Sequence, residues 1–210
     1  MSKVRLICGD CLDVLPTLEA ESVDAVVTDP PYPEIDRDYG RWTEAEWWDL
    51  MMGVCREVRR ILKPSGSAVF ILQPNSKRVG SMRSWLFDFQ AWVCRQWNMV
   101  QDAYWWNVTA LPLAGSTEFG LMRPSVKHAV WCGPADCWRN QQSILWGETD
   151  RSKVARLADR AGGLSSAESK SPGGLRKVLP RMTVAAETRG GVTPHNILPI
   201  KNNRSPSHAG

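Results

Sequence analysis

The sequence lacks any apolar run of the ~20 residues that a membrane-spanning helix requires. It also lacks a secretory signal, because a short strand-like segment begins close to the first methionine. The six cysteines are therefore interpreted as reduced thiols rather than as disulfide partners. These absences predict a cytoplasmic protein with no membrane association.

The sequence also offers little to a metal ion. His128, Cys132 and Cys137 form an H-x3-C-x4-C string, but no second cysteine pair at ligand spacing accompanies it. A structural zinc site needs four such ligands. We therefore expect no metal centre, and zinc at this string remains the minor alternative.

Acidic side chains become scarce after residue 150. Residues 1–150 carry 15 basic and 19 acidic side chains, whereas residues 151–210 carry 11 basic and 3 acidic ones, a balance of +8. A basic segment of this kind favours contact with phosphate groups, and a solvated tail is the alternative. Eleven tryptophans, unusual for 210 residues, fit either a packed core or stacking on nucleic-acid bases.

The most informative stretch that is present is the D-P-P-Y sequence at residues 29–32. It follows an apolar run at residues 23–27 with the β-branched bias of a buried strand. Two consecutive prolines cannot extend a central strand, so the strand ends there with Asp29 at its carboxyl end. In an open parallel α/β sheet this edge binds ligands. A Pro-Pro turn with a solvated Asp29 and a packing Tyr32 is the plainer alternative.

A second acidic residue is expected beside Asp29. Residues 4–8 suggest a first strand that ends at Gly9-Asp10, and residues 11–18 suggest a short amphipathic helix leading into the next strand. This β-α-β spacing implies parallel neighbours in one sheet. Asp10 and Asp29 would then lie together at one edge of the sheet.

Further elements follow from periodicity and turn signals. Thr43 and Glu46 form a capping box that begins a helix running to about residue 62, where Lys63-Pro64-Ser65-Gly66 is expected to break it. The segment at 108–124 is a candidate functional loop, and residues 150–191 a mobile basic lobe. The remaining expected elements are strands at 67–72, 99–107 and 126–132 and a helix at 82–97.

Residues 9–12 (GDCL), 24–32 (DAVVTDPPY) and 62–66 (LKPSG) together resemble the amino-methylating DNA methyltransferases in their permuted β arrangement. The resemblance implies an α/β, Rossmann-like methyltransferase fold with a mainly parallel sheet. In that arrangement the D-P-P-Y half comes first, a target-recognition region follows, and the S-adenosylmethionine-binding G-x-G loop comes last. No F-x-G-x-G or equivalent occurs in this sequence, so we expect a fold that is incomplete at its C-terminus.

The resemblance divides the chain into three parts. Residues 1–98 correspond to the catalytic core, residues 99–191 to the target-recognition region with a basic insertion, and residues 192–210 to a linker toward the missing cofactor-binding half. It implies a restriction-modification enzyme that methylates an exocyclic base amine of double-stranded DNA, with S-adenosylmethionine as donor. Adenine N6 is the favoured target over cytosine N4.

The resemblance also assigns roles to the site residues. The Asp29 side chain and the Pro30 carbonyl would accept the two N–H groups of the amine, Pro31 would stiffen the loop, and Tyr32 would stack on a base flipped out of the duplex. Asp10, with Asp29, would contact the cofactor.

Several alternatives remain open at this point. A catalytically inactive DNA-binding fragment is one alternative. Methylation of RNA or of a protein glutamine is another, but the related enzymes for those targets usually place the Gly-rich loop before this motif. Only 28 residues precede Asp29, too few for that order. The absence of a Pro-Cys pair disfavours C5-cytosine methylation. The partner would be double-stranded DNA, and a homodimer or a complementing chain would be the protein partner.

Overall fold

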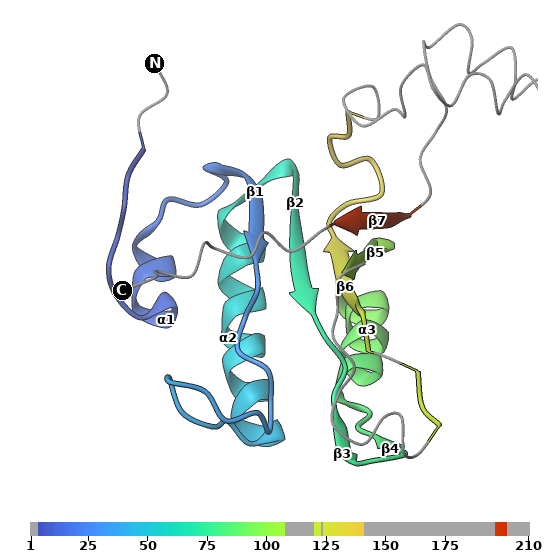
Figure 1. Ribbon diagram of the computed structural model, residues 1–210. Coiled ribbons are helices and arrows are strands. Elements are labelled where there is room, and N and C mark those ends of the chain that lie inside the picture. Colours follow the sequence, from blue (N-terminus) through green and yellow to red (C-terminus); the bar gives the residue numbers. More distant parts are fainter. Residues whose placement is uncertain (1–3, 108–119, 123, 141–195, 201–210) are drawn as a thin grey trace, which may run out of the picture. The chain divides into compact units, whose positions relative to one another are not determined.

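The computed structural model describes residues 4–107, 120–122, 124–140 and 196–200 (Figure 1). The chain divides into two compact units, residues 1–138 with 196–210, and residues 139–195; all the elements below belong to the first unit. No helix among the described residues is both long and apolar enough to cross a membrane. The helices are α1 (Cys11–Val14), a 3-10 turn (Leu15–Thr17), α2 (Glu44–Ile61) and α3 (Trp85–Gln96).

The strands form one larger sheet and one hairpin. β1 (Val23–Thr28), β2 (Leu62–Leu72), β6 (Val126–Cys132), β5 (Met99–Asn107) and β7 (Ile197–Ile200) make a sheet in the order β1-β2-β6-β5-β7. β3 (Ser76–Arg78) and β4 (Ser81–Met82) make a separate hairpin that the sequence did not predict.

The sheet is mixed rather than mainly parallel. β1 pairs with β2, and β5 with β7, in parallel, whereas β6 runs antiparallel to both of its neighbours. The α/β class is therefore confirmed, but the expected mainly parallel sheet is wrong for the described residues. The reason is that β6 returns from β5 as an antiparallel neighbour and inserts beside β2.

The crossover from β1 to β2 begins with the predicted capping box. Thr43 Oγ1 accepts from the backbone N–H of Glu46, and the Glu46 carboxylate accepts from the backbone N–H of Thr43, at 3.2 and 2.8 Å. α2 then ends at Ile61, and β2 begins at the next residue. The predicted end of the helix is therefore confirmed, whereas residues 63–66 lie inside β2 and lengthen the strand expected at 67–72.

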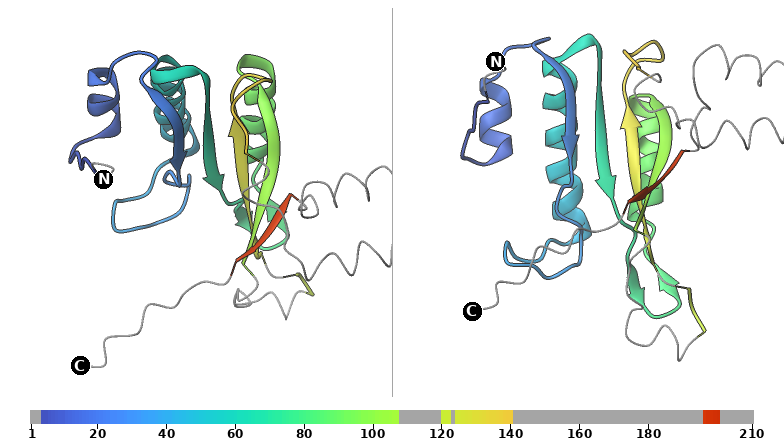
Figure 2. Two further views of the ribbon diagram at one scale, coloured as in Figure 1. Left: turned by 90° about the horizontal axis from the view of Figure 1, so that it is seen from above. Right: turned by 45° about the horizontal axis from the view of Figure 1, so that its top comes forward.

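Aromatic side chains fill the core between the helices and the sheet. Figure 2 shows α2 and α3 on one side of the strands. Trp47 of α2, Phe89 of α3 and Phe70 of β2 are all fully buried, and the Phe89 ring lies 5.5 Å from that of Trp47 and 5.8 Å from that of Phe70, centroid to centroid. These edge-on contacts tie both helices to β2 and give its carboxyl end a rigid support.

The expected first strand at residues 4–8 is not formed. Those residues have no strand assignment, and Val4 and Leu6 are 84% and 93% exposed. An extended apolar segment becomes a strand only when a neighbour pairs with its backbone. Within the described part of the chain, β1 is the outer strand of the sheet and residues 4–8 pair with no strand.

The strands expected at 99–107 and 126–132 match β5 and β6, and the helix expected at 82–97 matches α3. The candidate functional loop at 108–124 and the basic lobe at 150–191 lie wholly or mostly outside the described residues.

Candidate functional site

The D-P-P-Y loop follows the carboxyl end of β1, and tryptophan side chains of the core contact it. The indole Nε1 of Trp47 donates to the carbonyl oxygen of Pro31 at 2.8 Å. The Tyr32 side chain is buried and lies 6.3 Å from the Trp85 ring in a stacked arrangement. The predicted strand end at Asp29 is therefore confirmed, and the loop that follows it is built on the aromatic core.

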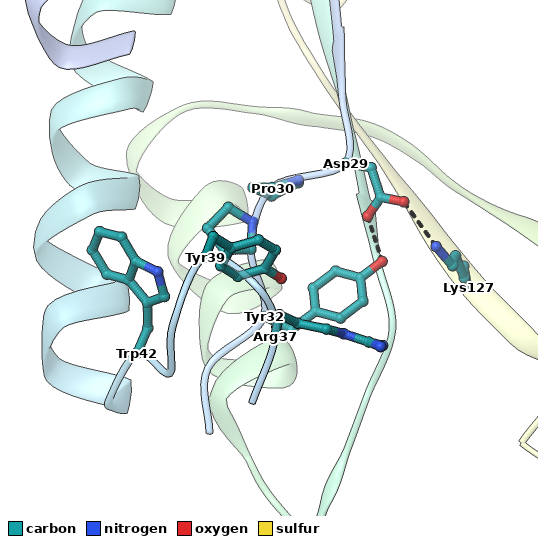
Figure 3. A pocket seen from close by; sticks show the side chains of 8 residues that line it. Asp29, Pro30, Tyr32, Arg37, Tyr39, Trp42 and Lys127 are labelled. Carbon is teal, nitrogen blue, oxygen red and sulfur yellow. Dashed lines mark hydrogen bonds and ion pairs between the residues drawn. The ribbon is translucent and has the colours of Figure 1, made fainter. Parts of the chain in front are cut away.

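Asp29 is the first residue of this loop, and each of its carboxylate oxygens accepts a hydrogen bond (Figure 3). The Tyr32 hydroxyl donates to Oδ1 at 2.5 Å, and the Lys127 ammonium donates to Oδ2 at 2.8 Å. The Asp29 side chain is still 46% exposed, so a ligand has access to it. The site therefore holds an oriented, solvent-accessible carboxylate.

The Tyr32 hydroxyl acts as a donor to Asp29. Burial raises the pKa of Tyr32, and its hydrogen bond to Asp29 raises the pKa further. A tyrosine with a raised pKa stays protonated throughout the neutral range. Tyr32 therefore fixes the orientation of the carboxylate and leaves the negative charge on Asp29.

The side chain of Lys127 connects the β5–β6 ribbon to the site through its contact with Asp29. It belongs to β6, opposite Trp105 of β5, and its Nζ lies 5.5 Å from the ring centroid of Tyr32 and 5.3 Å from that of Trp105. Both distances are within the range of cation–π attraction. Two aromatic rings and one carboxylate thus position this ammonium group.

The loop after Tyr32 forms the outer wall of the site. Its ends are joined by a 2.6 Å hydrogen bond from the Glu34 N–H to the Trp42 carbonyl and by an ion pair between Arg41 and Glu34. The Arg41 contact lowers the pKa of Glu34, so the ion pair persists at neutral pH. Arg37, Tyr39 and Trp42 from this loop line, with residues 29–32 and Lys127, a cavity of about 610 Å³.

The size of that cavity falls in the range of small-molecule sites, and its walls combine aromatic rings with one carboxylate. Such a lining suits a flat, amine-bearing heterocycle. No described residue donates a hydrogen bond to the Pro30 carbonyl, which leaves a second acceptor beside Asp29.

Of the residues predicted from the sequence, the structure brings Asp29, Pro30, Pro31 and Tyr32 together and leaves Asp10 out. Asp10 is the N-cap of α1, where its Oδ1 accepts from the Leu12 N–H at 2.8 Å, and it does not line the Asp29 cavity. The expected pairing of Asp10 with Asp29 at one sheet edge is therefore wrong for this structure. The cause is the missing strand at residues 4–8, whose end was to carry Asp10.

From the sequence, Lys127 could contact phosphate, with a solvated surface position favoured, and no role follows for Arg37, Tyr39 or Trp42. The signal for Lys127 is the strand order and direction, which the structure gives and the sequence does not. β6 runs antiparallel to β2, so its first residues lie at the edge where β1 and β2 end. The loop residues carry no such signal, because loop paths do not follow from periodicity.

The residues present do not fit the whole of a nucleoside cofactor. Within the described ranges, the cavity lining contains no glycine, and Asp10 is committed to α1. A Gly-rich loop at a helix N-terminus, the usual cradle for such a cofactor, is therefore not among the described groups at this site. The exposed Asp29 carboxylate can accept a hydrogen bond from a ligand N–H group.

Comparisons with known proteins agree with this geometry. The sequence model of the DNA methylase family (N6_N4_Mtase) matches residues 23–130, just over half of the chain. The type II methyltransferase M.PvuII of Proteus hauseri is 25% identical over 213 residues, covering 94% of this chain and 59% of that protein. M.HpaI of Haemophilus parainfluenzae is 34% identical over 67 residues, 30% of this chain and 21% of that protein.

A solved structure titled PvuII DNA methyltransferase (cytosine-N4-specific) has the same fold. Its TM-score is 0.62 at 19% sequence identity, covering 95% of this chain and 58% of that one. The chain therefore spans about three fifths of the length of M.PvuII. The family match includes β1, the D-P-P-Y loop, both long helices and most of β6, which are the elements that build the Asp29 site. From its sequence and from this site, the chain belongs to the DNA methylase family.

Proposed function

We propose that this chain supplies the amine-binding half of a DNA methyltransferase that uses S-adenosylmethionine. The observation that carries the proposal is the oriented, accessible Asp29 carboxylate at the end of β1. Pro30, whose carbonyl accepts no hydrogen bond from a described residue, lines the same cavity. M.PvuII and M.HpaI are methyltransferases by name, which supports the same reaction type here.

The proposed chemistry needs two acceptors. An exocyclic base amine is a poor nucleophile because its lone pair is delocalised into the ring. If Asp29 and the Pro30 carbonyl each accept one N–H, the nitrogen becomes pyramidal and its lone pair is freed. The incoming amine would replace Lys127 at Oδ2 of Asp29, while Tyr32 would keep Oδ1 in place and stack on the base. S-adenosylmethionine, when bound, supplies the electrophilic methyl group.

Two target bases compete within this proposal. Adenine N6 is the first candidate, because the acidic first residue of D-P-P-Y favours it. Cytosine N4 is the second, because a structural neighbour is named cytosine-N4-specific. The proposed substrate is double-stranded DNA with the target base flipped out, since neither amine is reachable inside the stack.

The described residues at the Asp29 site include no cofactor cradle. We assign the methyl donor's binding groups to residues outside those described or to a complementing chain, with residues 1–98 as catalytic core, 99–191 as recognition region and 192–210 as linker. The proposed location is the cytoplasm.

The test is nucleoside mass spectrometry of host DNA after expression of the chain, alone and with the remaining two fifths of M.PvuII supplied as a second polypeptide. N6-methyladenine or N4-methylcytosine that disappears in Asp29→Ala is the expected result. A matched Asp49→Ala change, at an exposed position of α2 that lines neither cavity, should keep the signal. DNA that lacks both modified bases in every arm would refute the proposed activity.

A second candidate is a DNA-binding chain without catalysis, favoured by the absence of a cofactor cradle among the described residues. Calorimetry with S-adenosylmethionine separates the two. Saturable cofactor binding by the chain excludes this second candidate.

A further inference from the structure

A second cavity adjoins the Asp29 cavity and differs from it in chemistry. Its volume is about 280 Å³, and it shares the side chains of Tyr32, Arg37 and Lys127 with the first cavity. The rest of its wall consists of neutral groups from the ends of β2 and β5 and the start of β6, including Gln73, Asn107 and Ser125. No carboxylate lines it, although the sequence neighbours of Arg37 are Asp36 and Asp38.

The two shared cations stand at the boundary between the cavities. In Figure 3 the Arg37 side chain runs beneath the ring of Tyr32 and ends on the side of Lys127. Arg37 makes no ion pair among the described residues, whereas Lys127 is bound to Asp29. The guanidinium of Arg37 therefore has donors available, in a planar fork that matches a phosphate or carboxylate.

We propose that the second cavity is a phosphodiester subsite, in which Arg37, assisted by Lys127, binds the backbone phosphate of the nucleotide whose base occupies the Asp29 cavity. A nucleotide carries a flat aromatic base and an anionic group joined through one sugar. Tyr32, Arg37 and Lys127 line both cavities, and the Asp29 carboxylate lines the first cavity but not the second. An anionic group is therefore better accommodated in the second cavity. When the amine takes Oδ2 of Asp29, the Lys127 ammonium loses that partner and becomes available to the phosphate.

The inference rests on the proposed function but is tested separately from it. Another anion, the carboxylate of the cofactor's amino-acid end, has the same chemistry. The experiment therefore compares 2′-deoxyadenosine 5′-monophosphate, 2′-deoxyadenosine and S-adenosylhomocysteine as probes. Binding to the full chain is followed by NMR chemical shifts and by tryptophan fluorescence, since Trp42 and Trp105 line the two cavities.

The nucleotide should bind about tenfold more tightly than the nucleoside, the change expected for one charged hydrogen-bonded contact. Arg37→Gln should lower the ratio of the nucleotide affinity to the nucleoside affinity to about one. The ratio is the readout because Arg37 also lines the cavity that the base would occupy. Arg37→Lys should keep part of the preference for the nucleotide. The matched control is Arg56→Gln, an exposed arginine on α2 that lines neither cavity.

Three results would overturn the assignment. Equal affinity for nucleotide and nucleoside, or no nucleotide binding at millimolar concentration, would remove the phosphate subsite. An Arg37→Gln change that weakens S-adenosylhomocysteine but not the nucleotide would give the cavity to the cofactor's carboxylate. If the nucleotide binds more tightly than the nucleoside and Arg37→Gln removes that preference, but no DNA methylation is found, the result would count against the proposed function only.

Discussion

The covered region around β2 and the open region around β1 show how differently one sheet can be supported. At β2, the helices α2 and α3 bury Phe70 and Leu72 completely. At the outer strand β1, Val27 is 72% exposed, and the adjoining residues 4–8 expose Val4 and Leu6. The covered region gives the site its rigidity. Among the described residues, the open region has exposed apolar surface and a strand edge with no pairing partner, so the two regions should respond differently to the changes below.

The largest difference is expected in cysteine reactivity. Cys55 and Cys132 lie in the core, and burial raises the pKa of the Cys55 thiol to about 12. Cys8 lies exposed in the open region, and Cys94 lies exposed on α3. Alkylation by iodoacetamide should be about a thousandfold slower at the two core thiols, because their reaction requires global opening. Peptide mass spectrometry over time measures the ratio of the alkylation rates. Labelling of Cys55 at the rate of Cys8 would show that the core is no better protected than the open region.

Removing the largest side chain of the covered region should cost the most stability. Trp47→Ala is expected to lower the free energy of unfolding by about 3–5 kcal/mol, because it empties a fully buried site and deletes the bond to the Pro31 carbonyl. Urea denaturation measures the loss. Trp47→Phe, which keeps a ring and removes only the indole N–H, is the control and should cost clearly less.

Tyr32 lies where the core meets the site, and its hydroxyl can be removed alone. Tyr32→Phe should cost about 1 kcal/mol of stability through loss of the bond to Asp29, because water can replace the hydroxyl at a half-exposed carboxylate. Paired denaturation curves of wild type and variant test the value. A cost as large as that of Trp47→Ala would place Tyr32 among the main supports of the core.

The smallest effect is expected in the open region. Leu6→Ser should change the free energy of unfolding by no more than about 0.5 kcal/mol, since the side chain is 93% exposed and packs on little. A larger loss in the isolated chain would show that residues 4–8 are already packed. If a complementing chain covers this region, the same substitution should instead weaken their association, which titration of the two chains measures.

Much of the chain from β1 onward could be predicted from the sequence, whereas the structure of residues 4–8 in the open region could not. The Thr43–Glu46 capping box, the end of β1 at Asp29 and the bounds of β5 and β6 all follow from local signals. The strand at residues 4–8 failed because its formation depends on a partner that its own sequence does not specify. The predicted position of Asp10 depended on that strand and was therefore also wrong. Asp10 instead caps α1 by accepting a hydrogen bond from the Leu12 N–H.

The site was likewise predictable only where it depends on local sequence. Asp29 and Tyr32 follow from a strand end and a proline pair. Lys127 reaches Asp29 across 98 positions in the sequence, and that contact depends on the antiparallel placement of β6. Arg37 depends on the path of a loop closed by Glu34 and Arg41, which hydrophobic periodicity does not encode.

The hydrogen bond from Trp47 to the Pro31 carbonyl joins the site to the first turns of α2. The D-P-P-Y loop and that helix should therefore open as one cooperative unit in native-state hydrogen exchange. The loop would then have no fast local opening of its own. The geometry of the acceptor site would persist for as long as α2 stays folded, with or without a ligand.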